Sequence, residues 1–328
     1  MRLFNRTGRH YVVVFLWVVF AVSAHGHPGD GLVMDAEGTL YFGWIDPPLG
    51  PGHHACVWKL DPEGHASPLF TSQHSYPGAQ SSNIFIILGL DGHLYCSERQ
   101  YLGDPEGYDK FVTDLWRIDP DGKKIRVLGP EPGRSPLGGP ACVVDRHGAI
   151  IYARDGHVLH KRNLDGRTSI LAGGALGHRD AKGVDAQFED ISAMAWGPDD
   201  VLYVYDKGTI RLVSPDGTVT TLDTGFVTFE EDIPPVLRQT HFFGMTVDDK
   251  GNVFGADWGK RRVVMVSSKG EISTLYRCEP PWRPEGIVWK DDVLYILEMT
   301  GPDVPAIKPR VRKRTPNGTM TTLFELSE

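Results

Sequence analysis

Short alternating runs of apolar and polar residues, separated by polar turns, dominate the chain from residue 31 to residue 328. Such runs are typical of half-buried β-strands, and no amphipathic helix of useful length interrupts them. One four-residue turn recurs, with Asp, Asn, Ser or Thr at its first position and Gly at its fourth. Glycine takes the left-handed conformation that returns the chain as a hairpin. The six copies are residues 61–64, 119–122, 163–166, 214–217, 267–270 and 315–318.

A second hairpin precedes each of these turns and ends on an aliphatic–aromatic pair. In five units an acidic residue stands three places after the aromatic one. We expect the aromatic side chains to be buried between sheets and the acidic ones to cap the turns that follow them. The pairs are Leu94-Tyr95 with Glu98, Ile151-Tyr152 with Asp155, Leu202-Tyr203 with Asp206, Val253-Phe254 with Asp257, Leu294-Tyr295 with Glu298, and Leu40-Tyr41 with Trp44 in place of an acid.

Two hairpins per unit give four strands, and six such units predict an all-β, six-bladed β-propeller of four-stranded antiparallel blades. A β-sandwich pair is the alternative, but it would not require one motif to recur in register. Both end units contain their own four strands, so we expect the ring to close without strand exchange. The predicted blades lie near residues 31–71, 83–129, 139–173, 191–224, 242–277 and 285–325.

The first 24 residues are typical of a secretory signal peptide. Arg2, Arg6 and Arg9 precede an apolar run over residues 11–22, and a small-residue cleavage site ends at Ala24. A permanent membrane anchor is the alternative, although the run is shorter than the ~20 residues that span a bilayer. We therefore expect a secreted or periplasmic protein whose mature chain, residues 25–328, is one propeller domain and is not inserted in a membrane.

The charge of the chain limits the classes of partner that we expect, and its cysteines bear on possible disulfides. The whole chain has a formal net charge of −8, and removal of the signal peptide takes away three arginines. An acidic mature chain with scattered basic residues argues against nucleic-acid binding. The four cysteines contain no C-x-x-C pair, and export permits a disulfide without choosing a pairing. They are Cys56, Cys96, Cys142 and Cys278.

The stretch 170–222 resembles the NHL-repeat propellers. It has their order of a glycine-rich loop, Ala186-Gln187-Phe188, a strand over residues 202–206 and the pair Ile210-Arg211. More distantly, the mature chain is similar to the senescence-marker-protein and gluconolactonase propellers, which are also six-bladed. These motifs specify architecture rather than chemistry.

Aligning the six units by their first turn places one residue of each just before the innermost strand. These are Asp30, Ile84, Pro140, Ser192, Phe243 and Glu285. In the gluconolactonase-like family this position supplies ligands for a divalent cation, such as Ca²⁺, that polarises a lactone carbonyl. The resemblance implies that role here only for Asp30 and Glu285. The two carboxylates are expected to be neighbours at ring closure, holding a cation, acting as acid and base, or bonding backbone amides or Arg283.

Long connections occur on one face only, within blades at residues 45–55, 99–113 and 299–309 and between blades at 174–190 and 225–241. Long loops on a rigid scaffold usually carry binding sites, so we expect this face to bind a small molecule, carbohydrate or protein. No catalytic motif is evident, and whether the protein is an enzyme stays open; a divalent-cation-dependent lactonase or hydrolase is the alternative function. The candidate ligand-binding residues are His241, Ser192, Arg283, Trp258, Trp282 and Arg238.

Overall fold

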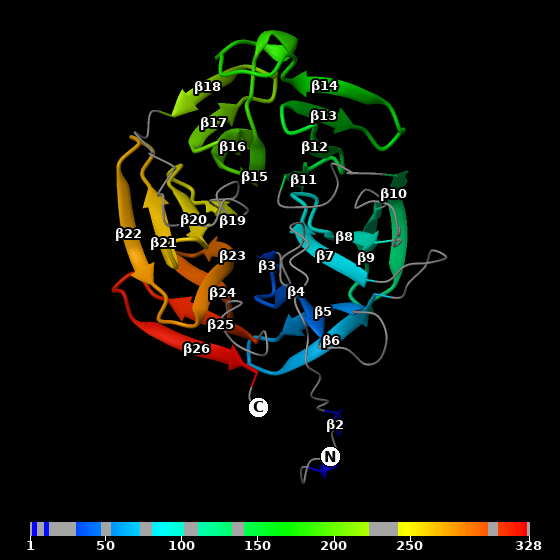
Figure 1. Ribbon diagram of the computed structural model, residues 1–328, viewed down its shortest axis with the longest axis vertical. Coiled ribbons are helices and arrows are strands. Elements are labelled where there is room, and N and C mark those ends of the chain that lie inside the picture. The colour runs from blue at the N-terminus through cyan, green and yellow to red at the C-terminus, as the bar shows by residue number, and fades with distance from the viewer. Residues whose placement is uncertain are drawn as a thin grey trace, which may run out of the picture.

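The computed structural model describes residues 2–4, 10–12, 31–46, 54–72, 81–101, 111–132, 141–222, 242–300 and 308–326. Figure 1 shows six sheets arranged in a ring, with the first strand of each toward the centre and the fourth at the rim. Each sheet contains four antiparallel strands that are consecutive in the chain. The prediction of a six-bladed propeller is therefore confirmed.

The blades follow one another along the chain. Blade one comprises β3 (Leu32–Met34), β4 (Leu40–Asp46), β5 (His54–Leu60) and β6 (Ala66–Thr71). Blade two comprises β7 (Ser81–Leu88), β8 (Leu94–Tyr101), β9 (Phe111–Ile118) and β10 (Lys124–Pro132). Blade three comprises β11 (Cys142–Val144), β12 (Ile150–Arg154), β13 (Val158–Arg162) and β14 (Thr168–Ala172).

The second half of the ring repeats this order. Blade four comprises β15 (Ile191–Trp196), β16 (Leu202–Asp206), β17 (Thr209–Val213) and β18 (Val219–Leu222). Blade five comprises β19 (Phe242–Val247), β20 (Val253–Asp257), β21 (Arg262–Val266) and β22 (Ile272–Arg277). Blade six comprises β23 (Trp282–Lys290), β24 (Val293–Thr300), β25 (Pro309–Arg314) and β26 (Met320–Glu325).

Other regular elements are few. A two-stranded ladder joins β1 (Arg2–Phe4) and β2 (His10–Val12), and the single-turn 3-10 helices are η1 (Gly183–Asp185) and η2 (Pro198–Asp200). No helix in the described part of the chain is long and apolar enough to cross a membrane. The four cysteines lie within the described ranges as buried thiols, so none of the disulfide pairings that the sequence left open is formed.

The ring closes as expected. The last strand, β26, pairs with β25 of its own blade, and β3 pairs with β4 of blade one. The seam between blades six and one is closed by side chains, because Leu32, Phe42 and Trp44 of blade one share a core cluster with Leu297 and Val311 of blade six. Closure therefore depends on apolar packing between complete sheets and not on a shared strand.

The aromatic residues of the second strands lie between blades, as expected, although to different degrees. Tyr95, Tyr203 and Phe254 are buried and pack toward the following blade, while Tyr41 and Tyr295 are half-buried. In blade three the sequence alignment is wrong by one residue.

The register of blade three explains the error. Ile150 pairs with the last residue before the inner turn, Val144, as Leu94 pairs with Leu88 in blade two. Ile151 is therefore the counterpart of Tyr95, and Tyr152 points the other way. Ile151 packs in the cluster between blades three and four, whereas Tyr152 packs with blade two. A one-residue shift moves a side chain to the opposite face of a strand.

Candidate functional site

The inner strands of blades four, five and six are distorted at the ring positions that the alignment singled out. In β15, Ile191 pairs with Asp206 and Ala193 with Tyr205, which leaves Ser192 as an extra residue. The register of β19 shifts between Phe242 and Met245, and that of β23 between Pro284 and Gly286. These β-bulges contain Phe243 and Glu285. Bulges re-aim side chains and are frequent beside functional sites.

Close packing of the inner strands accompanies these bulges. A Cβ on Gly244 would lie 2.7 Å from the Glu285 carbonyl oxygen, and one on Gly286 would lie 2.7 Å from the Leu32 Cβ atom. Only glycine permits such contact. Each of these glycines directly follows a ring residue. Through Gly244 the backbone of blade five approaches that of blade six, and through Gly286 blade six approaches blade one. This packing holds the ring residues in position at the long-loop end.

Glu285 is the acidic ring residue that the structure describes, and its side chain lies between blades five and six. The residue is 2% exposed, and its Oε1 atom accepts a hydrogen bond of 3.2 Å from Trp258 Nε1. Trp258 follows β20 and is itself buried, and Phe243 meets its ring edge-on with centroids 5.5 Å apart. The Trp258 indole therefore contacts both the Glu285 carboxylate and the Phe243 ring at the long-loop end.

Arg283 extends this cluster on the indole. Its guanidinium carbon lies 4.3 Å from the Trp258 ring centroid, and its Nη1 atom donates to the Trp258 carbonyl oxygen at 3.2 Å. The cation–π contact and the hydrogen bond both hold Arg283 on Trp258. We define the channel-end cluster as Phe243, Trp258, Arg283 and Glu285.

Trp282 belongs to a different group. Its ring lies 4.0 Å from the guanidinium carbon of Arg310, and Arg310 Nε donates to Glu298 Oε2. The thiol of Cys278 donates to Glu298 Oε1 at 3.2 Å. Burial, together with the Glu298 carboxylate, raises the pKa of Cys278 well above its ordinary value. The cysteine is therefore a protonated structural thiol, and Trp282 supports Arg310 instead of joining the channel-end cluster.

The acidic residues that end the second strands are mostly members of ion pairs. Within the described ranges, Asp257 caps a turn in the expected way, accepting from the Lys260 amide at 3.3 Å. Asp155 differs from the others, since the register shift of blade three leaves it exposed with a φ of 54° and 4.0 Å from the Arg154 Nε atom. The ion pairs are Glu98 with Lys124 at 3.0 Å, Asp206 with Arg211 at 2.9 Å, Asp257 with Arg262 at 2.8 Å, and Glu298 with Arg310.

The other candidate residues are only partly placed. Ser192 is half-buried in the bulge of β15, one blade away from Phe243. Asp30, His241 and Arg238 lie outside the described residues. Across the described ranges, no three His, Cys, Asp or Glu side chains converge as metal ligands. The metal-binding role of Asp30 and Glu285 therefore stays a prediction, because only one of the two carboxylates lies within the described ranges.

Sequence reasoning placed Phe243 in the ring but did not connect it with Trp258. The tryptophan stands 27 residues before Glu285 and reaches it from the neighbouring blade. The one available signal was the position of Trp258 directly after a second strand, at the long-loop end.

The fold is shared with solved structures of low sequence identity. No protein-family model matches the chain. No curated protein matches it either. Virginiamycin B lyase from Staphylococcus aureus is 14% identical, with 92% of this chain and 85% of that chain covered and a TM-score of 0.51. A gluconolactonase from Xanthomonas campestris is 15% identical, with coverages of 87% and 86% and a TM-score of 0.51. A Bacteroides thetaiotaomicron protein of unknown function is 14% identical, with coverages of 84% and 68% and a TM-score of 0.51. The lyase and the gluconolactonase are six-bladed propellers, and the present chain shares that architecture with them.

Proposed function

We propose that this protein is an exported propeller that binds a small molecule, a carbohydrate or a protein partner at the long-loop end of blades four to six. One observation carries the proposal. The buried carboxylate of Glu285 lies in a bulge and accepts a hydrogen bond from Trp258, whose ring packs against Phe243. Aromatic rings supply apolar contact area, and a single buried carboxylate supplies a directional acceptor.

The surrounding backbone supports the same location. Three consecutive inner strands bulge at this end, in blades four, five and six. The inner strand of blade two runs through its ring position without a bulge, since Ile84 pairs with Glu98 in continuous register. Among the ring positions that the structure describes, the distortion thus occurs in blades four to six and not in blade two. A locally distorted inner rim on a rigid scaffold suits a ligand site.

The tryptophan offers a direct test. We would titrate the mature protein with a panel of sugars, sugar acids and lactones and record tryptophan fluorescence. Binding at this site should change the signal of the wild type and disappear in Trp258→Phe and Glu285→Gln. Trp196→Phe is the matched control, because the Trp196 indole also donates one hydrogen bond, to the Val144 carbonyl at 3.0 Å, but at the short-turn end of blade four. Equal responses in all variants would contradict the proposed location.

Export and catalysis are tested separately. N-terminal sequencing of the secreted protein should begin at His25, and a retained residue 1 would contradict signal-peptide cleavage.

The lactonase alternative has no observation of its own in its favour among the described residues. Metal analysis of the mature protein, beside lactone and ester assays with and without Ca²⁺, would reinstate it if a bound cation and turnover were both lost in Glu285→Gln.

A further inference from the structure

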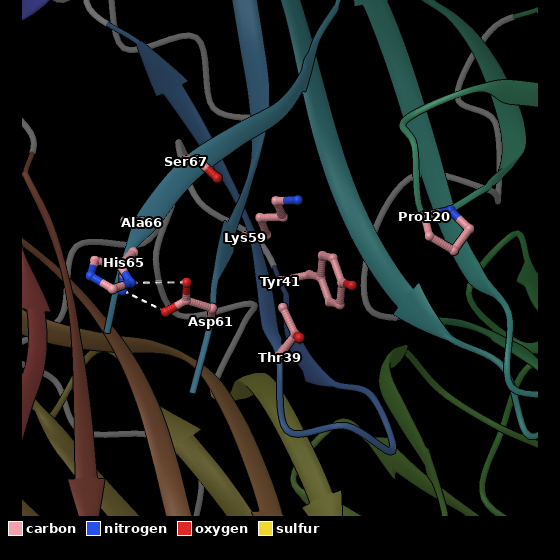
Figure 2. Close-up of a pocket in the computed structure, with 8 residues that line it drawn as sticks. All are labelled: Thr39, Tyr41, Lys59, Asp61, His65, Ala66, Ser67 and Pro120. Atoms are coloured by element: carbon pink, nitrogen blue, oxygen red, sulfur yellow. Dashed lines mark hydrogen bonds and ion pairs between the residues drawn. The ribbon is translucent and has the colours of Figure 1, made fainter. Parts of the chain in front are cut away.

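A hollow opens between blades one and two at the short-turn end, away from the channel-end cluster. Its volume is about 450 Å³, and its lining includes Tyr41, Lys59 and Ser67 of blade one and Pro120 of blade two. Figure 2 shows the Tyr41 ring and the Lys59 amine extending from the blade-one strands toward the side where Pro120 lies. Nothing in the proposed function uses this space.

Strand register explains why these side chains share the hollow. Tyr41 pairs with Lys59, and Lys59 pairs with Ser67, so the three residues form one row across β4, β5 and β6. Residues opposite one another in a sheet point to the same face. Tyr41 packs against a cluster that includes Ile84 of blade two, so this face is turned toward blade two. The Lys59 amine therefore lies in the gap between two blades.

Blade three has an equivalent row of residues across its strands, but there the lysine forms an ion pair. Lys161 pairs with Ile151 on one side and with Ser169 on the other. Its ammonium group forms an ion pair of 2.8 Å with Asp145, the first residue of the inner turn. The lysine of blade three is thus neutralised by its own blade.

In blade one the corresponding carboxylate has other partners. Asp35 Oδ2 accepts from the Tyr41 hydroxyl at 3.0 Å, and Asp35 Oδ1 accepts from the Thr39 amide at 2.8 Å. The isoleucine of blade three has no hydroxyl, which leaves Asp145 free to pair with its lysine. Among the described residues, Lys59 forms no ion pair or side-chain hydrogen bond. The tyrosine thus leaves Lys59 as a positive charge without a counterpart.

The acidic residue that lines the hollow is hydrogen-bonded at its edge. Asp61 Oδ1 accepts from the His65 amide at 2.7 Å, and Oδ2 lies 3.1 Å from His65 Nδ1. The His65 amide is the main reason why the pKa of Asp61 is lowered, and the His65 ring adds to the effect. The Asp61 carboxylate is therefore held by His65 and forms no ion pair with Lys59.

We propose that this hollow binds a small anion of the carboxylate or phosphate type, with Lys59 as the charge partner and the Ser67 hydroxyl as a second donor. An ammonium group is a point charge with three donors, which suits either anion. The flat face of Tyr41 would contact the apolar part of an organic carboxylate, whereas inorganic phosphate would use the polar groups alone.

The experiment uses Lys161 as an internal control. The lysines of the mature protein are converted to ¹³C-dimethyl-lysine, which keeps the positive charge, and the Lys59 signal is identified as the one missing in Lys59→Gln. The protein is titrated with sodium phosphate and, separately, with sodium acetate at constant ionic strength set by sodium chloride. We expect a saturable shift of the Lys59 signal with at least one of the two anions, while the Lys161 signal stays in place.

Substitutions separate binding from general ionic effects. Loss of a hydrogen-bonded charge should weaken binding about tenfold or more, measured in Lys59→Gln through the remaining signals of blades one and two. Lys161→Gln should bind as the wild type does, and Lys59→Arg should retain binding. Phosphate alone or acetate alone would identify the anion type. A linear shift that chloride reproduces, no shift with either anion, or unchanged affinity in Lys59→Gln would overturn the proposal; thermal melting checks that each variant is folded.

Discussion

The loop over blade four and the channel-end cluster of blades five and six both bury charge, but they do so differently. Arg211 is completely buried, and its guanidinium pairs with Asp206 at 2.9 Å and with Asp180 at 2.8 Å. Glu285 is 2% exposed, and it accepts a hydrogen bond from the neutral indole of Trp258 on another blade. The arginine is matched by opposite charges from its own blade and loop, whereas the glutamate lies at a distorted junction of blades.

The contacts of Arg211 show what this charge does. Asp206 also accepts from the amides of Glu189 and Asp190, both at 2.8 Å, and the Phe188 ring lies 5.0 Å from the guanidinium carbon. The arginine and its carboxylates therefore order the loop 174–190 against blade four. Buried charge by itself is thus no mark of a functional site, and the partners and backbone around it decide which role it has.

The largest expected effect on stability comes from breaking the buried ion pair of Arg211 and Asp206. Arg211→Met should lower the free energy of unfolding by about 3–5 kcal/mol, because it leaves Asp206 buried without its cation. Urea denaturation followed by circular dichroism measures this change. A loss under about 1 kcal/mol would mean that the loop does not depend on the buried pair.

Acid should weaken the same loop. Burial alone would raise the pKa of Asp180, but hydrogen bonds from Thr221 and Arg211 lower it overall. A carboxyl group whose pKa is lower when folded stabilises the protein above its unfolded pKa of about 3.9, and this contribution is lost as pH falls through the folded pKa. We expect the free energy of unfolding to decline below about pH 4 and to decline less steeply in Asp180→Asn. Denaturation curves across this range provide the measurement, and identical slopes would refute the assignment.

The channel-end cluster should be less important for stability. Trp258→Phe removes the indole N–H but keeps a ring beside Phe243 and Arg283, so the loss should be about 0.5–1.5 kcal/mol, typical of one hydrogen bond. Guanidinium denaturation measures it. A loss as large as that of Arg211→Met would show that this cluster, too, is chiefly structural.

The smallest effect is expected at an exposed ion pair of the same loop. Lys207 lies 2.8 Å from Glu189, with 48% and 36% of the two side chains exposed. Because solvent screens such pairs, Lys207→Ala should leave the denaturation midpoint unchanged within error. A clear shift would indicate that the ordering of the loop does not come from Arg211 alone.

Local chemistry explains why the architecture could be predicted. Each repeated turn needs only a capping side chain and a glycine, and these act within a few residues, as in Asp61–His65 and Gly64. Blade three shows the limit of such rules. Its sequence Ile150-Ile151-Tyr152 fits the aliphatic–aromatic pattern at Ile151-Tyr152, but the pairing of Ile150 with Val144 places Ile150-Ile151 at the equivalent positions. Packing against two neighbouring blades decides which face is buried.

The ion-pair partners of the acidic residues that end the second strands also depend on tertiary structure. Asp206 pairs with an arginine five residues later on the next strand, whereas Glu98 pairs with Lys124, 26 residues later on the outer strand. The two acidic residues occupy equivalent positions in the repeat, so no local rule distinguishes their partners. For the same reason the sequence pointed to turn capping where the structure has ion pairs.

The sequence by itself determined the number of blades, the four strands in each and the ring positions that include Ser192, Phe243 and Glu285, because turn formation and strand alternation act over a few residues. Tertiary structure decided how the charges are matched. Whether Lys59 or Lys161 finds a carboxylate depends on the residue opposite it, and whether Glu285 meets Trp258 depends on how closely two blades pack. Contacts of this kind join residues distant in sequence, so they exist only after the ring has formed.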